Sequence, residues 1–168
     1  MIDIVRHAAI WLPIAATALL LMELWAALLH RRIWHRRLWP VHRTHHRSRT
    51  GRFETNDLLS ALHAPVAVAL VLYGCVGRSG AGRELLFGIG VGMSVFGAMY
   101  FVLHDGLVHG RLPVSGLLRL RWLRRIVRAH RVHHLSLRGG APFGFFFGPW
   151  ELRRVRTIKG SRVAKTPR

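Results

Sequence analysis

The sequence predicts an all-α integral membrane protein, built as a helical bundle with three membrane spans and a histidine-rich cap on the cytoplasmic side. Three observations indicate this fold class. The 168 residues suffice for a single domain, and 51% of them are hydrophobic although the formal net charge is +19. The apolar residues form three long stretches, which the basic residues avoid. Ten of the twelve histidines occur in four short motifs that follow the first and the third stretch.

Each stretch has the length of a transmembrane helix. The stretches cover residues 8–29, 58–76 and 85–103, and Glu23 is the only Asp, Glu, Lys or Arg among them. About 20 predominantly apolar residues cross the hydrocarbon core of a bilayer as a helix. The first stretch resembles a signal peptide, but no clear small-residue cleavage site follows it, so we expect it to be retained.

The second and third stretches are joined by residues 77–84, a short and glycine-rich connection. Such a connection predicts an antiparallel hairpin of two helices. Gly88 and Gly92 in the third stretch have GxxxG spacing, and Gly97 follows them. This pattern favours close packing of helix backbones in membranes.

The basic residues predict the orientation of the helices. Residues 30–57 and 104–168 hold 23 of the 26 lysines and arginines, and the other three lie at the opposite ends of the stretches. Because basic residues favour the cytoplasmic side, we expect a multi-pass protein of the cell membrane with both basic regions in the cytoplasm and the N-terminus outside. The basic tail, about residues 153–168, is expected to be a solvated or headgroup-facing arm.

The four histidine motifs have the same order in both halves of the chain. An HX4H motif begins where the first stretch ends, an HX2HH motif follows it, and the same pair recurs after the third stretch. All four motifs should therefore lie on one side of the membrane. Their ten histidines are the candidate metal ligands: His30, His35, His42, His45, His46, His104, His109, His130, His133 and His134.

The spacing within each motif has geometric consequences. In a helix, positions i, i+3 and i+4 share a face, so each HX2HH motif can point three imidazoles at one centre. Positions i and i+5 lie roughly 140° apart, so an HX4H pair converges only if the helix bends, ends or contains a wide turn.

Ten imidazoles exceed the ligands of one metal ion, whereas two ions with about five each would use them all. Neutral imidazole suits iron, copper, nickel and zinc. A structural zinc site is usually closed by four ligands, often cysteines, and Cys75 is the only cysteine here. The Glu-x-x-His pairs of carboxylate-bridged di-iron bundles are absent. The motifs therefore favour two non-haem irons that activate oxygen.

Four acidic residues are candidates for holding ligand imidazoles through hydrogen bonds. A carboxylate within a membrane span is costly, so Glu23 is expected to bond either to a ligand imidazole or to another helix. Asp57 is alternatively a helix cap. The four candidates are Glu23, Glu54, Asp57 and Asp105.

Three features lie outside the motifs. We interpret His7 as an interfacial residue and His63 as a polar residue with a satisfied hydrogen bond in the second span. Residues 141–150 are apolar but too short and too rich in Gly and Pro to span a bilayer. They are either an interfacial or re-entrant segment or a segment packed on the cytoplasmic cap.

The histidine motifs and their neighbours resemble the bacterial β-carotene hydroxylase family, within the membrane fatty-acid hydroxylase and sterol desaturase superfamily. The four histidine motifs alone indicate the superfamily. The carotenoid assignment depends on the residues around them, over roughly residues 20–150. The most specific block is the HDGLVH of residues 104–109, and further matching segments are residues 22–30, 53–57, 100–103, 129–134 and 143–145.

This resemblance implies hydroxylation of the 3-position of β-ionone rings, which converts β-carotene through β-cryptoxanthin to zeaxanthin. It implies O2 as co-substrate and electrons from reduced ferredoxin or a similar donor, with a carotenoid and membrane lipid as the other partners. No catalytic residue is expected beyond the metal ligands. The preference between β-carotene and keto-carotenoids stays open.

Other functions are weighed against this one. The nearest alternative is another lipid or sterol hydroxylase or desaturase with the same di-iron chemistry. A b-type haem carrier would leave most of the ten histidines unused. The sequence pI near 12 suggests nucleic acid, but no nucleic-acid-binding motif is evident, so we expect no nucleic-acid partner.

Overall fold

The computed structural model describes residues 2–47, 51, 53–76, 80–135 and 140–163. These residues form helices and no strand, which confirms the all-α prediction. The elements in chain order are α1 (Ile2–Leu29), the π-helical turn η1 (His30–Trp34), α2 (Trp39–His42), α3 (Asp57–Ala61), α4 (Ala64–Cys75), α5 (Ala81–Tyr100), the π-helical segment η2 (Phe101–Val108), the 3-10 helix η3 (Ser115–Arg119), α6 (Arg121–His134) and α7 (Gly148–Val163).

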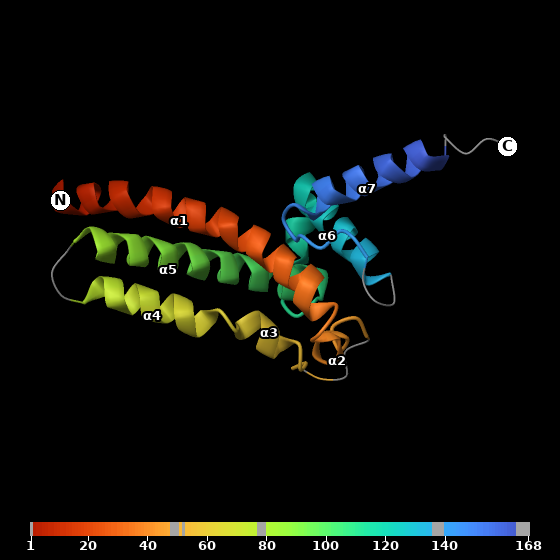
Figure 1. The fold of residues 1–168 in the computed structure, drawn as a ribbon, viewed down its shortest axis with the longest axis horizontal. Coiled ribbons are helices and arrows are strands. Elements are labelled where there is room, and N and C mark those ends of the chain that lie inside the picture. Colours follow the sequence, from red (N-terminus) through yellow and green to blue (C-terminus); the bar gives the residue numbers. More distant parts are fainter. Residues whose placement is uncertain (1, 48–50, 52, 77–79, 136–139, 164–168) are drawn as a thin grey trace.

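Among the described residues, three helical segments are long and apolar enough to cross a membrane: His7–Trp34, Asp57–Cys75 and Ala81–Val108. The prediction of three spans is thereby confirmed. The first and third segments extend beyond the apolar stretches because the π-helical elements continue α1 and α5 without a break. The long helices lie side by side, with the N-terminus at one end of the bundle and α2, α6 and α7 towards the other (Figure 1).

Helix α5 is the central element because it packs against both α1 and α4. A Cβ atom at Gly88 would lie 2.8 Å from Ile14 of α1, and one at Gly90 would lie 2.8 Å from the backbone nitrogen of Val71 in α4. Gly92 is also pressed against α1, so the GxxxG pair is an interface as predicted.

The expectation of close packing at Gly97 is wrong. A Cβ atom at Gly97 would meet no atom within 4 Å, because this glycine borders a cavity.

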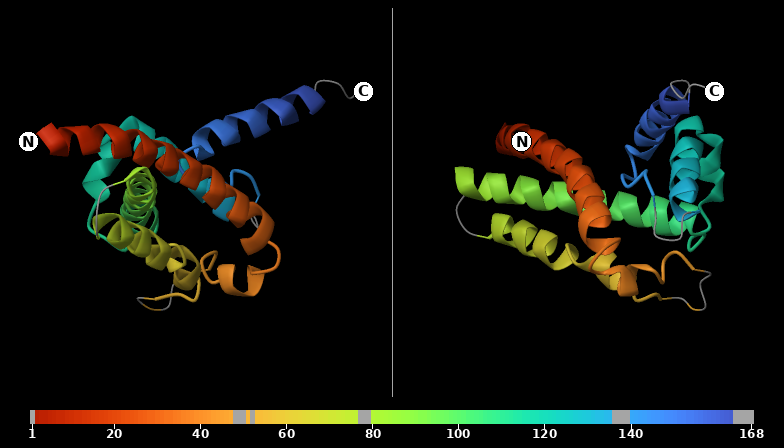
Figure 2. Two further views of the ribbon diagram at one scale, coloured as in Figure 1. Left: turned by 60° about the vertical axis from the view of Figure 1, so that its left-hand side comes forward. Right: turned by 45° about the vertical axis from the view of Figure 1, so that its right-hand side comes forward.

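In both views of Figure 2, α1 crosses the direction of α5 before it ends near α2. The hairpin predicted for the second and third stretches is seen as the packing of α4 on α5, although residues 77–79 of its turn lie outside the described residues.

The cap at the far end of the bundle is organised by α6. Its apolar side chains Leu123, Ile126 and Val127 are buried in a cluster with Leu103, Leu107 and Phe145. Burying this face leaves the arginines of α6 exposed on the other side, which makes the helix strongly amphipathic. Residues 141–150 pack onto the cap, with Pro142 and Phe145 buried, and so match the second of the two interpretations. Helix α7 continues through the predicted basic tail to Val163, and residues 164–168 lie outside the described part.

Candidate metal centre

Both HX4H motifs form π-helical turns. The backbone nitrogen of His35 donates to the carbonyl of His30 at 3.0 Å, and that of His109 donates to the carbonyl of His104 at 3.1 Å. This i to i+5 bonding widens the turn and brings residues five apart onto one side. The ring centroids of His30 and His35 are therefore 4.7 Å apart, and those of His104 and His109 are 4.8 Å apart. The wide turn that the spacing required is confirmed.

The HX2HH motifs do not each point at a single centre, and that expectation is wrong. In α6, His130 and His134 are separated by about 40° around the helix, whereas His133 lies about 100° from His134. His133 accordingly faces one group of histidines while His130 and His134 face another. The other motif divides in the same way, because His42 and His46 join the group of His133 and His45 joins the second group. Each HX2HH motif thus bridges two sites.

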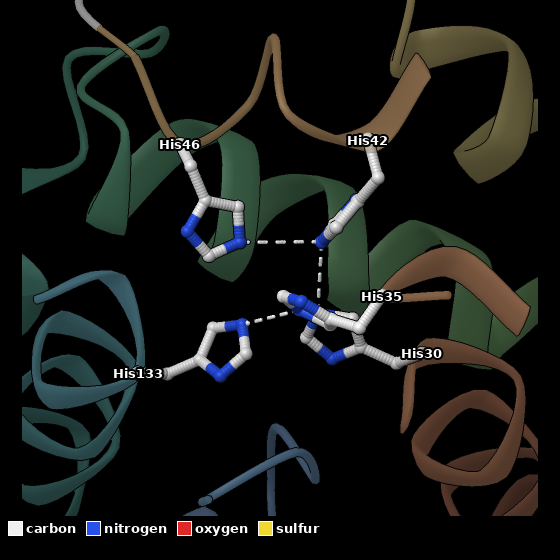
Figure 3. A group of neighbouring side chains, drawn as sticks. All are labelled: His30, His35, His42, His46 and His133. Carbon is white, nitrogen blue, oxygen red and sulfur yellow. Dashed lines mark hydrogen bonds between the residues drawn. The ribbon is translucent and has the colours of Figure 1, made fainter. Parts of the chain in front are cut away.

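The first group consists of His30, His35, His42, His46 and His133, and each offers a ring nitrogen within 4.8 Å of all the others. Figure 3 shows the five rings pointing towards one another from three separate parts of the chain. The Nε2 atom of His30 lies 3.0 Å from the Nε2 atoms of both His42 and His35. The Nε2 atom of His35 lies 3.0 Å from that of His133.

Hydrogen bonds on the far side of three rings show which nitrogen carries the proton. Nδ1 of His30 lies 2.9 Å from the carbonyl oxygen of Phe143, and Nδ1 of His133 lies 2.7 Å from that of Gly140. Nδ1 of His42 lies 2.7 Å from Oδ1 of Asn56. A carbonyl oxygen only accepts, so each Nδ1 carries the donated proton once these bonds are assigned, and each Nε2 has a lone pair.

Lone pairs therefore face one another at the centre of the first group. Nε2 of His30 and Nε2 of His42 cannot share a hydrogen bond, because neither has a proton to donate. A cation between them removes this repulsion. Metal–imidazole bonds of about 2.0–2.1 Å place neighbouring ligand nitrogens, at right angles, roughly 3.0 Å apart. The observed 3.0 Å separations fit that arrangement.

The second group consists of His45, His109, His130 and His134. Nε2 of His130 lies 2.8 Å from that of His134 and 3.4 Å from that of His109. His104 lies beside this group, with its ring 4.7 Å from the ring of His45. Its Nε2 is buried and has no hydrogen-bond partner within the described part of the chain. Nine of the ten predicted histidines are therefore gathered in two groups of five and four, and His104 lies next to the second group.

Burial favours the neutral form that metal binding requires at several histidines outside the spans. Burial lowers the pKa of His42 to about 3 and that of His133 to about 4. Burial likewise holds the pKa values of His45 and His130 well below their usual range. At neutral pH these imidazoles have free lone pairs, and the two groups could each hold a metal ion.

Two carboxylates lie beside the second group and the adjacent His104. The Oε2 atom of Glu54 lies 3.7 Å from Nδ1 of His45, and the Oδ1 atom of Asp105 lies 3.2 Å from Nδ1 of His104. Carboxylates in this position fix the orientation of an imidazole and raise its basicity as a ligand. Two of the four acidic candidates therefore lie beside histidines, Asp105 within hydrogen-bond distance and Glu54 beyond it.

Arg111 is a residue that sequence reasoning missed. Its guanidinium lies 2.9 Å from Asp57, 3.4 Å from Glu54 and 3.9 Å from Asp105. Asp57 accepts a hydrogen bond from Arg111 and another from the backbone nitrogen of Glu54, at 2.9 Å each. Asp57 therefore stabilises the loop that carries Glu54 rather than an imidazole. The only sequence signal for Arg111 was its place just after the HDGLVH block.

Glu23 is buried but bonds to backbone rather than to a ligand imidazole. The backbone nitrogen of Phe147 donates to its Oε1 at 3.0 Å. Glu151, a second residue missed from the sequence, accepts the backbone nitrogens of Phe143 and Gly144 at 2.8 and 3.1 Å. The two glutamates hold the loop whose Phe143 carbonyl orients His30. Glu23 thus acts on the first group indirectly, by its contact with another segment.

Asn56 is a further partner of the first group, and the two histidines outside the groups have partners of their own. Asn56 is 2% exposed and bonds to His42, but nothing in its spacing in the sequence indicates this role. His63 accepts a hydrogen bond from the indole nitrogen of Trp25 at 2.9 Å, which agrees with its interpretation as a satisfied polar residue. His7 pairs with Glu84, at the far end of the bundle from the histidine groups.

Comparisons with known proteins identify the family of the chain. The chain matches the family described as fatty acid hydroxylase over residues 15–153. It is 39% identical to the β-carotene hydroxylase of Pseudescherichia vulneris, over 90% of this chain and 86% of that protein. It is also 42% identical to β-carotene hydroxylase 2, chloroplastic, of Capsicum annuum, over 83% of this chain and 50% of that protein.

A similar relation holds for β-carotene 3-hydroxylase 1, chloroplastic, of Arabidopsis thaliana, which is 43% identical over 80% of this chain and 43% of its own length. The chain thus spans about half the length of these two plant relatives. No solved structure matches the chain significantly.

Proposed function

The chain belongs to the fatty acid hydroxylase family and, within it, to the β-carotene hydroxylases, and on this premise we propose that it is an oxygen-dependent β-carotene 3-hydroxylase. Its substrate is the β-ionone ring, and its products are β-cryptoxanthin and then zeaxanthin. The observation that supports the proposal most is the convergence of nine imidazoles in two groups, with His104 beside the second, at the end of a bundle of three apolar helices.

Each histidine group would hold one iron ion. The first ion is assigned to His30, His35, His42, His46 and His133, and the second to His45, His104, His109, His130 and His134. Five imidazoles suit iron, and they leave a position at each ion for oxygen. The iron pair would supply the reductive activation of O2. In the overall reaction one oxygen atom replaces a ring hydrogen as hydroxyl, the other leaves as water, and two electrons and two protons are consumed.

The residues of this chain contribute position and exclusion of water. Asn56 and the carbonyls of Phe143 and Gly140 keep the protons on the outer nitrogens, so the inner nitrogens stay available. Phe145 packs against the rings of His104 and His130 and covers the second group on its apolar side. Such a dry site protects a reactive centre from water.

The electron donor is proposed to be a reduced ferredoxin or a similar acidic protein. The exposed face of α6 presents a row of arginines, and the same helix holds His130, His133 and His134. A concentrated positive face steers an acidic protein towards the metal pair. It would also attract anionic lipid headgroups. Removing these charges should raise the KM for ferredoxin and make that KM depend less on salt concentration. The arginines are Arg121, Arg124, Arg125, Arg128 and Arg131.

The orientation in the membrane is also part of the proposal. Helices α2 and α6, which belong to the basic regions, lie at the histidine end of the bundle, and the N-terminus, the end of α4 and the start of α5 lie at the other end (Figure 1). By the positive-inside tendency, the histidine groups face the cytoplasm of the cell membrane and the N-terminus faces outside.

The proposal is tested by expressing the chain in a host that makes β-carotene and analysing the pigments. Wild type should yield zeaxanthin, and His7→Ala, a histidine variant remote from both groups, should match it. His133→Ala should lose at least about tenfold in activity and bind less iron per protein, because a ligand is removed. Unaltered carotene with an altered lipid or sterol would instead identify the sibling chemistry of the same superfamily.

A further inference from the structure

A cavity of about 480 Å³ lies between α1, the α3–α4 segment and α5. Most of its lining is apolar, with Met22 and Ala26 from α1, Ala67 from α4, and Met93 and Gly97 from α5. The opposite end of the cavity is polar, since Asp57, Asp105 and Arg111 line it. These are residues of the carboxylate network beside the second histidine group, so the cavity reaches the edge of the metal centre.

A small chamber of about 10 Å³ lies beside both histidine groups, since His30 of the first group and His130 of the second line it. Ala26, Trp34 and Tyr100 line both this chamber and the cavity, so the two spaces share a wall. A ring that enters the cavity therefore lies next to the region between the two proposed irons.

A second apolar groove, of about 500 Å³, continues the cavity along the seam between α1 and α5. Met22 and Met93 line both spaces, and the groove extends from them to Pro13 and Leu85 near the other end of the bundle. From Pro13 to Leu29, sixteen helical steps of about 1.5 Å give a length of about 24 Å. This length approaches the hydrocarbon thickness of a bilayer, about 30 Å.

We propose, on the premise of the proposed function, that cavity and groove together form one binding site for a long, rigid isoprenoid with a ring at its end. The reacting ring lies in the cavity beside Trp34 and Tyr100. The polyene passes Met22 and Met93 and lies along the groove towards Pro13. The second ring is then held at the opposite end of the bundle, so one binding event presents a single ring to the metal pair. The second hydroxylation requires release and re-entry in the reverse direction.

The length and the lining of the two spaces favour a carotenoid as the occupant. A long hydrocarbon with a ring at its end suits an apolar cavity and an apolar groove that share Met22 and Met93. Gly97 contributes to the width because a Cβ atom there would meet nothing within 4 Å. Larger side chains at this position fill the cavity without displacing the helix backbone.

The test combines two variants with two substrates. Gly97→Leu narrows the ring cavity, and Thr17→Trp obstructs the groove that Thr17 lines. Leu24→Trp is the matched control, because Leu24 is exposed on α1 and lines neither space. The substrates are β-carotene and a truncated carotenoid with one β-ionone ring and a chain too short to reach Thr17. Binding is also measured on iron-free protein in nanodiscs, from the circular dichroism that achiral β-carotene acquires on binding.

The inference predicts different responses to the two changes. Gly97→Leu should lower kcat/KM at least about tenfold for both substrates, as removing space for a few methylenes does in other pockets. Thr17→Trp should lower it at least about tenfold for β-carotene alone and should also weaken the induced dichroism. Leu24→Trp should change neither substrate's kinetics, and all three variants should keep wild-type iron content.

Two outcomes separate this inference from the proposed function. If wild type makes zeaxanthin but Thr17→Trp affects both substrates equally or neither, the binding site is wrong and the hydroxylase assignment stands. If wild type neither binds nor hydroxylates β-carotene, the proposed function itself fails. Direct appearance of zeaxanthin, without free β-cryptoxanthin at early times, would contradict the single-ring mode of binding.

Discussion

Replacing Arg111 by methionine gives the most informative test of how the second histidine group is held. Arg111 is only 12% exposed and faces Asp57, Glu54 and Asp105. Methionine keeps most of the length of the side chain but removes its positive charge. Three carboxylates then lose their shared cation in a place that water hardly reaches.

The size of the effect follows from the contacts. Removing one partner of a fully buried ion pair costs about 3–5 kcal/mol. The side chains of Arg111, Glu54 and Asp57 are only partly buried, at 12%, 11% and 23% exposed, so the loss of stability should lie below that range. Glu54 and Asp105 also lie beside His45 and His104, so their displacement should lower the metal affinity of the second group by about 10–100-fold. No contact joins Arg111 to the first group within the described residues, so the first group should keep its affinity for its metal ion.

The assay is a metal titration of the purified protein in detergent, together with its thermal unfolding. At a free iron concentration that just fills both sites of wild type, Arg111→Met should retain only one ion per chain. Arg128→Met is the control, since Arg128 is an exposed arginine of α6, and it should match wild type. Adding Asp57→Asn to Arg111→Met should restore part of the stability, because Asp57 faces the arginine and no histidine. Wild-type stability and two ions of normal affinity in Arg111→Met would refute the reasoning.

Three further predictions concern other parts of the molecule. Asn56→Leu should lower the iron affinity of the first group by about 10–100-fold, because His42 loses the acceptor of its Nδ1 proton. An isothermal titration in which both sites keep their wild-type iron affinity would contradict this prediction. Gly92→Val should destabilise the bundle by about 1–3 kcal/mol or more, since its side chain would overlap α1, whereas Gly97→Ala should leave the denaturation midpoint of the protein unchanged. Cys75 is exposed at the end of α4 away from the histidine groups, so it should react with a membrane-impermeant maleimide added outside intact spheroplasts. Cys75→Ser is the blank. Reaction only after permeabilisation would show that the protein has the opposite orientation in the membrane.

Much of the fold could be predicted from local patterns. The three helices follow from uninterrupted apolar stretches, because hydropathy over about 20 residues is a property of each segment alone. The wide turns of the HX4H motifs could also be foreseen, since His30 and His35 cannot converge on a regular helix. The gathering of ten histidines at one end followed from the positions of the motifs relative to the spans.

The partners of the histidines could not be predicted in this way. Arg111 and Glu151 act through contacts with residues distant in sequence, and their spacing carries no signal. Glu23 was noticed because a carboxylate within a span is costly, but only the packing of the loop on α1 identified the Phe147 backbone as its partner.

The sequence by itself thus determined that the chain forms apolar helices and that its imidazoles collect at one end of them. Tertiary structure alone decided that each HX2HH motif is divided between two groups, that His42 bonds to Asn56, and that a cavity opens beside Gly97. The physical reason is that periodicity describes directions around one helix, whereas ligand groups and cavities depend on the distances between helices. Those distances are set by the packing of side chains from the whole chain.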